Sequence, residues 1–271
     1  MRAIITIILG AKMIFLLILA FKNQLSAQMR KPLEFLVGLL MLILNNSFYL
    51  YGIYLLAILS VDDNPLAAKE YLISTGMVLT SWGLLNVFGG GLYELGRMIE
   101  TGELEAYLSK PRSPLFLAAL SKSNFLSLAE VVQGVITIIV CSIFYGPLTG
   151  ITMLASSCVL VFAFASVIIV VGALSFFSSR GSQLSYVVMQ VVLSLSLFPV
   201  GRALKGREKW ILCFSPLLIT ATLPRASVIQ GGFEHLLVFI AATTGCFLMS
   251  VAFFNFGLKF YKSKNMVSLN E

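Results

Sequence analysis

Long apolar runs alternate with short polar segments along the chain. A helix that crosses a bilayer needs about 20 mostly apolar residues, and the edges of the runs are marked by charges, proline or glycine. The predicted spans are residues 33–60, 71–95, 115–145, 148–177, 184–200 and 236–260. The pattern therefore predicts an all-α integral membrane protein with six transmembrane helices.

Two further apolar segments do not fit a straight spanning helix. Lys12 interrupts residues 4–21, which favours a helix lying along the cytoplasmic interface over one that crosses. Pro216 and Pro224 break residues 211–229, and irregular backbone is unstable when it is exposed to lipid. We expect this second segment to form a helical hairpin that re-enters from the outer face and packs against protein.

Composition agrees with a membrane class. Hydrophobic residues make up 58% of the chain, charged residues only 11%, and the mean hydropathy is +0.94. The net charge is +7, but its Lys and Arg residues are scattered between apolar runs and form no basic face. We therefore expect membrane lipids and no nucleic acid as partners.

The basic residues also predict the orientation. Cytoplasmic loops carry an excess of Lys and Arg, and most of the 19 basic residues lie on the inner side if both termini are cytoplasmic. Lys69, Arg225 and the basic loop 202–209 fall on the outer side as exceptions. The predicted layout is one permease domain, divided into an interfacial region (1–32), spans 1–2 (33–95), a cytoplasmic loop (96–114), spans 3–5 (115–200), an outer loop with the hairpin (201–235), span 6 (236–261) and a cytoplasmic tail (262–271).

The cytoplasmic loop predicts a two-turn amphipathic helix. Thr101 is a suitable N-cap, acidic residues follow in the first turn, and Pro111 stops the helix after Lys110. Leu104 and Leu108 are four residues apart and form an apolar stripe with Tyr107 beside it. Two interpretations stay open, since such a helix either docks into a partner or lies on the lipid surface.

The sequence of this loop resembles a known family. Residues 102–114 read Gly-Glu-Leu-Glu-Ala-Tyr-Leu-Ser-Lys-Pro-Arg-Ser-Pro. They are similar to the loop Gly-x-Leu-(Asp/Glu)-x-x-Leu-x-(Arg/Lys)-Pro-x-x-Pro of type-2 ATP-binding cassette (ABC-2 type) permeases. The resemblance implies a coupling helix that fits a groove on a nucleotide-binding ATPase subunit. The residues that it assigns to this contact and its turn are Gly102, Glu103, Leu104, Tyr107, Leu108, Lys110, Pro111 and Pro114.

The resemblance also implies partners and a cellular location. It implies a dimer of permease chains, identical or different, with two ATPase subunits in a bacterial cytoplasmic (inner) membrane. The sequence has no G-x-x-x-x-G-K-[ST] phosphate loop, so ATP and Mg are expected on the ATPase partner, with no cofactor and no metal on this chain. The implied function is the membrane subunit of an exporter that works by alternating access.

Other polar residues leave alternatives open. A stripe at spacings of three and four residues in the fifth span lines a substrate path or forms hydrogen bonds between helices; its members are Gln183, Tyr186, Gln190 and Ser194. Glu130 lies about 15 residues, or roughly 22 Å, into the predicted third span, which marks it as a functional candidate; a later start of that span would bring it nearer the interface. The glycines at 89–91 either form a hinge or permit tight packing.

Two other functions are weighed against this one. An intramembrane enzyme needs convergent acids, histidines or a metal set, which the sequence does not offer. An ATP-independent secondary transporter or channel is the other alternative; secondary transporters often show an internal repeat, and none is visible here. The predicted function is therefore transport with no catalytic residues on this chain.

Overall fold

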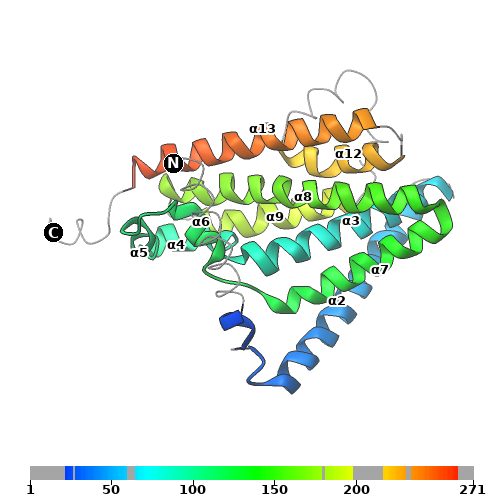
Figure 1. Cartoon of the computed structure of the whole chain (residues 1–271), viewed down its shortest axis with the longest axis horizontal. Helices are drawn as coiled ribbons and strands as arrows, with labels where there is room; N and C mark the ends of the chain where they lie inside the picture. Colours follow the sequence, from blue (N-terminus) through cyan, green and yellow to red (C-terminus); the bar gives the residue numbers. More distant parts are fainter. Residues whose placement is uncertain are drawn as a thin grey trace, which may run out of the picture.

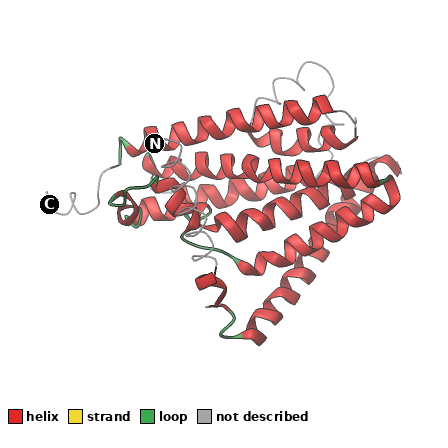
Figure 2. Cartoon of the chain, viewed as in Figure 1, coloured by secondary structure: helices red, strands yellow, loops and turns green. Residues whose placement is uncertain are grey.

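The structure is a computed structural model that describes residues 22–26, 28–59, 65–178, 181–197, 216–229 and 233–261. Every regular element within these residues is a helix, so the predicted all-α class is confirmed (Figure 2). The predicted interfacial segment 4–21, the basic outer loop 202–209 and the tail 262–271 lie outside the described residues.

Five helical segments among the described residues are long and apolar enough to cross a membrane. They are Pro32–Gly52, Lys69–Thr101, Phe125–Tyr145, Pro147–Phe176 and Phe233–Leu258. The fifth predicted span, 184–200, corresponds to α9 (Gly181–Leu197), whose 17 described residues stand at the lower limit of the length needed for a crossing. The chain is thus a multi-pass membrane protein, and a crossing by α9 stays a prediction.

Helix α8 (Pro147–Ala173) forms the centre of the bundle. Its neighbours are α3 (Pro65–Gly89), α7 (Leu128–Tyr145), α9, α12 (Pro216–Ile229) and α13 (Phe233–Leu258). Figure 1 shows these long helices side by side, with the short helices α4, α5 and α6 gathered at one end of the bundle. Helix α2 (Pro32–Leu59) runs obliquely to the others, and none of its most apolar stretch is buried.

Small residues allow α3 and α7 to pack at backbone distance. A Cβ added to Gly134 of α7 would lie 2.5 Å from the backbone nitrogen of Thr80 in α3. One added to Gly83 of α3 would lie 2.8 Å from the backbone oxygen of Ser127. Close approach through glycine is a common way for membrane helices to associate, because lipid provides no hydrophobic drive between them.

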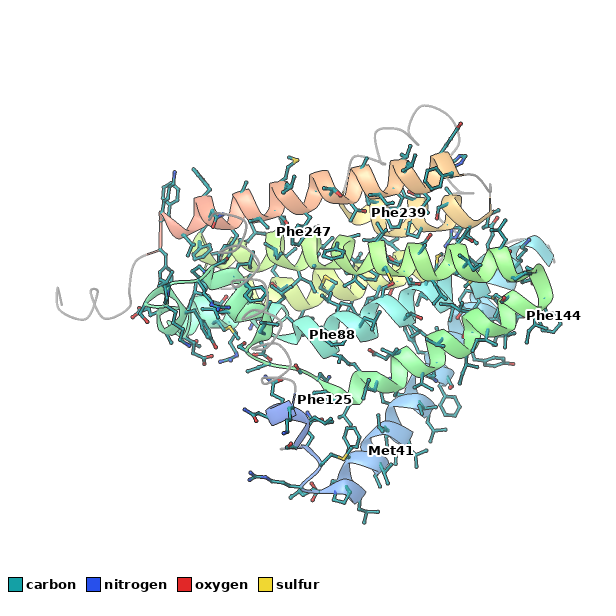
Figure 3. The ribbon with its side chains drawn as sticks, viewed as in Figure 1. Met41, Phe88, Phe125, Phe144, Phe239 and Phe247 are labelled. Atoms are coloured by element: carbon teal, nitrogen blue, oxygen red, sulfur yellow. The ribbon has the colours of Figure 1, made fainter. Side chains whose placement is uncertain are left out.

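Large apolar side chains cover the outside of the bundle. Met41 of α2 is 63% exposed and Phe144 of α7 is 76% exposed, whereas Phe125 and Phe239 are fully buried (Figure 3). An apolar exterior of this extent is costly in water and suits a hydrocarbon surrounding. The exposed faces of α2, α7 and α13 are therefore the lipid-facing or partner-facing sides of the protein.

The predicted third span is wrong at its start. Residues 115–145 form two helices, α6 (Pro114–Leu120) and α7, separated by a polar turn and the short 3₁₀ helix η2 (Phe125–Ser127). Asn124 begins the new helix because its side-chain oxygen accepts a hydrogen bond from the Leu126 N–H at 3.2 Å. Because both segments are apolar, the hydropathy pattern along the chain showed no sign of the break between them.

The new start moves Glu130 to the first turn of α7. The depth of roughly 22 Å expected from a continuous helix is therefore wrong, and the alternative of a later start is the one observed. Its side chain is 8% exposed, and Ser127 and Asn46 are the polar side chains that face it. Glu130 thus lies between α2 and α7 near a helix end.

Helix α12 covers part of the expected hairpin, and its prolines do not interrupt it. Pro224 lies inside the helix. Arg225, predicted among the outer basic residues, is only 6% exposed, and its Nε donates to the Ser74 hydroxyl of α3 at 2.9 Å. The Ser227 and Ser156 hydroxyls, 2.7 Å apart, join α12 to α8. Re-entry of this segment from the outer face stays a prediction.

Candidate coupling site

The polar end of the bundle is built from the segment that follows α3. A short 3₁₀ helix η1 (Gly90–Leu92) leads into α4 (Leu95–Thr101), and α5 (Glu105–Leu108) follows after a turn. Gly102 makes this turn with φ of +82°, a conformation that residues with a Cβ adopt only with strain. The role of Gly102 in shaping the turn is therefore supported by its backbone.

The helix in this loop differs from its prediction in start and length. Thr101 is the last residue of α4 rather than an N-cap, and its hydroxyl donates to the Arg97 carbonyl at 2.9 Å. Helix α5 has 4 residues, about one turn instead of two. It ends at Leu108, before Pro111, and Pro114 opens α6 at a position where a missing N–H costs nothing.

An ion cluster holds α4 and α5 together. The Arg97 guanidinium donates from Nη1 and Nη2 to the two Glu103 carboxylate oxygens at 2.6 and 2.9 Å. Its Nε donates to Glu94 at 2.6 Å, and Lys122 lies 3.3 Å from the same Glu94 oxygen. A paired contact of this kind fixes orientation as well as charge. Glu103 therefore stabilises the turn through its contact with Arg97, and only the exposed side of its side chain is available to a partner.

The apolar stripe expected on this helix is divided between two sides. Leu104 is fully buried and belongs to the core of the bundle, so it cannot offer an outward surface. Leu108 is 42% exposed. Tyr107 packs partly against the core, and the Lys110 ammonium lies 5.2 Å from its ring centre. The outward surface of α5 and the turn after it, called the coupling face below, therefore consists of Leu108, the exposed edge of Tyr107 and Lys110.

The end of α13 lies close to this segment. The Tyr261 ring is 5.7 Å from the Phe176 ring of η3 (Leu174–Phe176). Burial raises the pKa of the Tyr261 hydroxyl, and the charge of Glu105 on α5 raises it further. Tyr261, which follows the end of α13, therefore lies near both η3 and Glu105 of α5.

Glu100 was missed by the sequence reasoning, although it lies in the same loop. Its carboxylate accepts hydrogen bonds from the Ser182 backbone N–H at 2.8 Å and from the Ser182 hydroxyl at 2.6 Å. The Ser175 hydroxyl donates to the same carboxylate at 3.4 Å. These contacts join α4 to the start of α9, 82 residues later in the chain. No sequence pattern reports a capping residue that comes from another helix.

The polar stripe of α9 lies on one side of the helix, as its spacing predicts. All four residues, Gln183, Tyr186, Gln190 and Ser194, are exposed within the described structure. Ser185, Met189 and Val192 fill the opposite, buried side. The Ser194 and Tyr49 hydroxyls are 2.9 Å apart, so the stripe reaches α2. Glu130 is not part of this face, since it packs between α2 and α7.

The glycines before α4 have a packing role. A Cβ on Gly91 would lie 1.9 Å from the Ala118 carbonyl oxygen of α6, and one on Gly90 would lie 3.1 Å from the Lys122 carbonyl oxygen. Of the two alternatives, tight packing is the one that these distances support.

The fold and the polar end define a class of protein, a multi-pass helical membrane protein with an ion cluster at one end of its bundle. A family model described as ABC-2 family transporter protein matches residues 66–265, which include this end and the helices above it. The chain belongs to this family of membrane transport proteins. The resemblance found in the loop is thereby confirmed, and association with an ATP-binding subunit follows from the family. No curated protein sequence matches the chain.

Proposed function

We propose that this chain is the membrane-spanning subunit of an exporter in the bacterial cytoplasmic membrane, driven by a separate ATPase subunit that docks on the coupling face. Transport proceeds by alternating access, in which ATP-driven closure and substrate binding favour different arrangements of the same helices. Two permease chains, identical or different, and two ATPase subunits form the complete exporter. ATP and Mg are held by the ATPase.

The observation that carries the proposal is the coupling face. An exposed leucine and an aromatic edge lie on a one-turn helix at the polar end of the bundle, and a cation follows two residues after the helix. A paired ion contact holds the turn before this helix in place. A small apolar anchor with a charged rim is the composition that protein interfaces use at their centre and edge. The rigid mounting supports docking over loose adsorption to lipid.

The test is co-purification with an ATP-binding cassette ATPase of the same genome, co-expressed with the chain. We expect Leu108→Asp to reduce the recovered ATPase by about tenfold or more, the scale of a central interface residue. Leu108→Met, which keeps the apolar surface, is the matched control and should retain the ATPase. Undiminished complex formation by Leu108→Asp would contradict docking at this face.

Leu104 provides a contrast within the same turn. Leu104→Asp places a charge in the buried core, where it has no ion partner, so we expect loss of folded permease before any effect on docking. Size-exclusion profiles of the isolated permease separate the two outcomes. Leu108→Asp should elute as the wild type does, and Leu104→Asp should not.

A further inference from the structure

We propose that Glu100 is a positioning residue that couples α4 to α9, so that displacement of the coupling face moves the polar stripe of α9. The proposal rests on the proposed function, because the displacement comes from the docked ATPase. It adds a defined route from the docking segment to one particular helix of the bundle.

The first step of the route joins α5 to α4. The two Arg97–Glu103 hydrogen bonds span the turn, and the Leu104 N–H donates to the Met98 carbonyl at 3.1 Å. Leu104 itself is fully buried beneath the turn. A helix of one turn that is fixed by side-chain, backbone and apolar contacts moves with α4 rather than independently of it.

The second step joins α4 to α9. The Glu100 carboxylate holds both the backbone N–H and the hydroxyl of Ser182, within the first turn of α9, where a negative charge also favours the helix dipole. The backbones are in contact as well. A Cβ on Gly96 would lie 3.1 Å from the Ser182 Cα and 2.9 Å from the Ser175 hydroxyl oxygen.

The third step follows from the direction of α9. Ser182 immediately precedes Gln183, the first residue of the polar stripe, and the stripe continues along the same helix to Ser194. Because a helix transmits displacement along its length, a shift at Ser182 moves the whole exposed face. The hydroxyl contact between Ser194 and Tyr49 carries that shift to α2.

Hydrogen–deuterium exchange of the full chain in lipid nanodiscs tests the static contact first. In the isolated permease, Glu100→Ala should raise the exchange rate of the Ser182 amide about tenfold, the scale of losing a hydrogen bond to a charged group. Glu100→Gln keeps one carbonyl acceptor and should show a smaller rise. Glu234→Gln, which changes an exposed acid in the first turn of α13, is the matched control and should leave α9 unchanged.

The decisive measurement uses the complex with the ATPase, with and without Mg-ATP and vanadate. In the wild type, nucleotide trapping should change the exchange of residues 181–197, and Glu100→Ala should lose most of this change while it still binds the ATPase. Ser182→Ala removes one of the two Ser182 contacts and should give an intermediate loss. It decides the matter if Glu100→Ala does not fold.

The possible failures are distinguishable. An unchanged nucleotide response of α9 in Glu100→Ala overturns the route through Glu100 and leaves the proposed function intact. Loss of ATPase binding by Glu100→Ala, in a permease that keeps its fold, assigns Glu100 to docking and also overturns the route. Absence of ATPase binding by the wild type overturns the proposed function together with the route that depends on it.

Discussion

At the scale of single residues, the ion pair between Glu103 and Arg97 predicts that the stability of the turn at Gly102 depends on pH. The hydrogen bonds from the Arg97 guanidinium lower the pKa of the Glu103 carboxyl. A carboxyl whose pKa is lower in the folded state stabilises the fold above its unfolded pKa, about 4.3 for glutamate, and this contribution is lost as pH falls through the lowered value. We expect the turn at Gly102 to open only in that acidic range.

Cleavage by pepsin, which is active in acid, measures this opening. Cleavage of the isolated permease within residues 102–110 should increase as pH falls through the lowered pKa. Glu103→Gln removes the titrating group. Cleavage within residues 102–110 should therefore be higher than in the wild type already at the highest pH tested, and it should no longer depend on pH. Glu94→Gln controls for the second acid that faces Arg97. A pH dependence that Glu103→Gln preserves would assign the opening to another group.

At the scale of elements, the packing of η1 against α6 depends on the missing side chain of Gly91. A methyl group there would overlap the Ala118 carbonyl, which cannot swing aside as a flexible side chain can. We expect Gly91→Ala to lower the free energy of unfolding by about 1–3 kcal/mol, the usual range for overpacking. Thermal unfolding in detergent should show a lower midpoint.

Gly245 provides the matched control for this change. It lies in the middle of α13, and a Cβ there would meet no atom within 4 Å. Gly245→Ala should be neutral or slightly stabilising, since alanine favours helix. If Gly91→Ala is equally well tolerated, tight packing at this position is contradicted, and the hinge interpretation of the three glycines is favoured instead.

At the scale of the whole molecule, the arrangement predicts which ends face the cytoplasm. Docking of the ATPase, as proposed, requires the coupling face to lie inside, and it then predicts that the opposite end, where α7 turns into α8, lies outside. Leu148 at this turn is 72% exposed. We expect an impermeant maleimide to label Leu148→Cys in intact cells and Ala106→Cys only in inverted vesicles, each above the background of the native cysteines. The reverse pattern would place the coupling face outside and contradict the predicted orientation.

The sequence by itself determined the class and the family. Each apolar run indicates a membrane helix by its own composition, and the loop pattern around Gly102 is a short local motif. Neither signal depends on which other helices pack against the segment. Most helix boundaries followed to within a few residues, but the break at Asn124 did not, because a polar turn of a few residues barely changes the hydropathy of a long apolar run.

Only the tertiary structure decided which side of each short helix faces inward. Leu104 and Leu108 are equivalent by periodicity, and only the packing of α5 on α4 buries one and exposes the other. The contacts of Glu100 with Ser182 and of Arg225 with Ser74 join residues far apart in the chain, for which a single sequence carries no signal. Hydrophobicity therefore assigned this protein to the membrane, and polar contacts between helices decided how its polar end is connected to the rest.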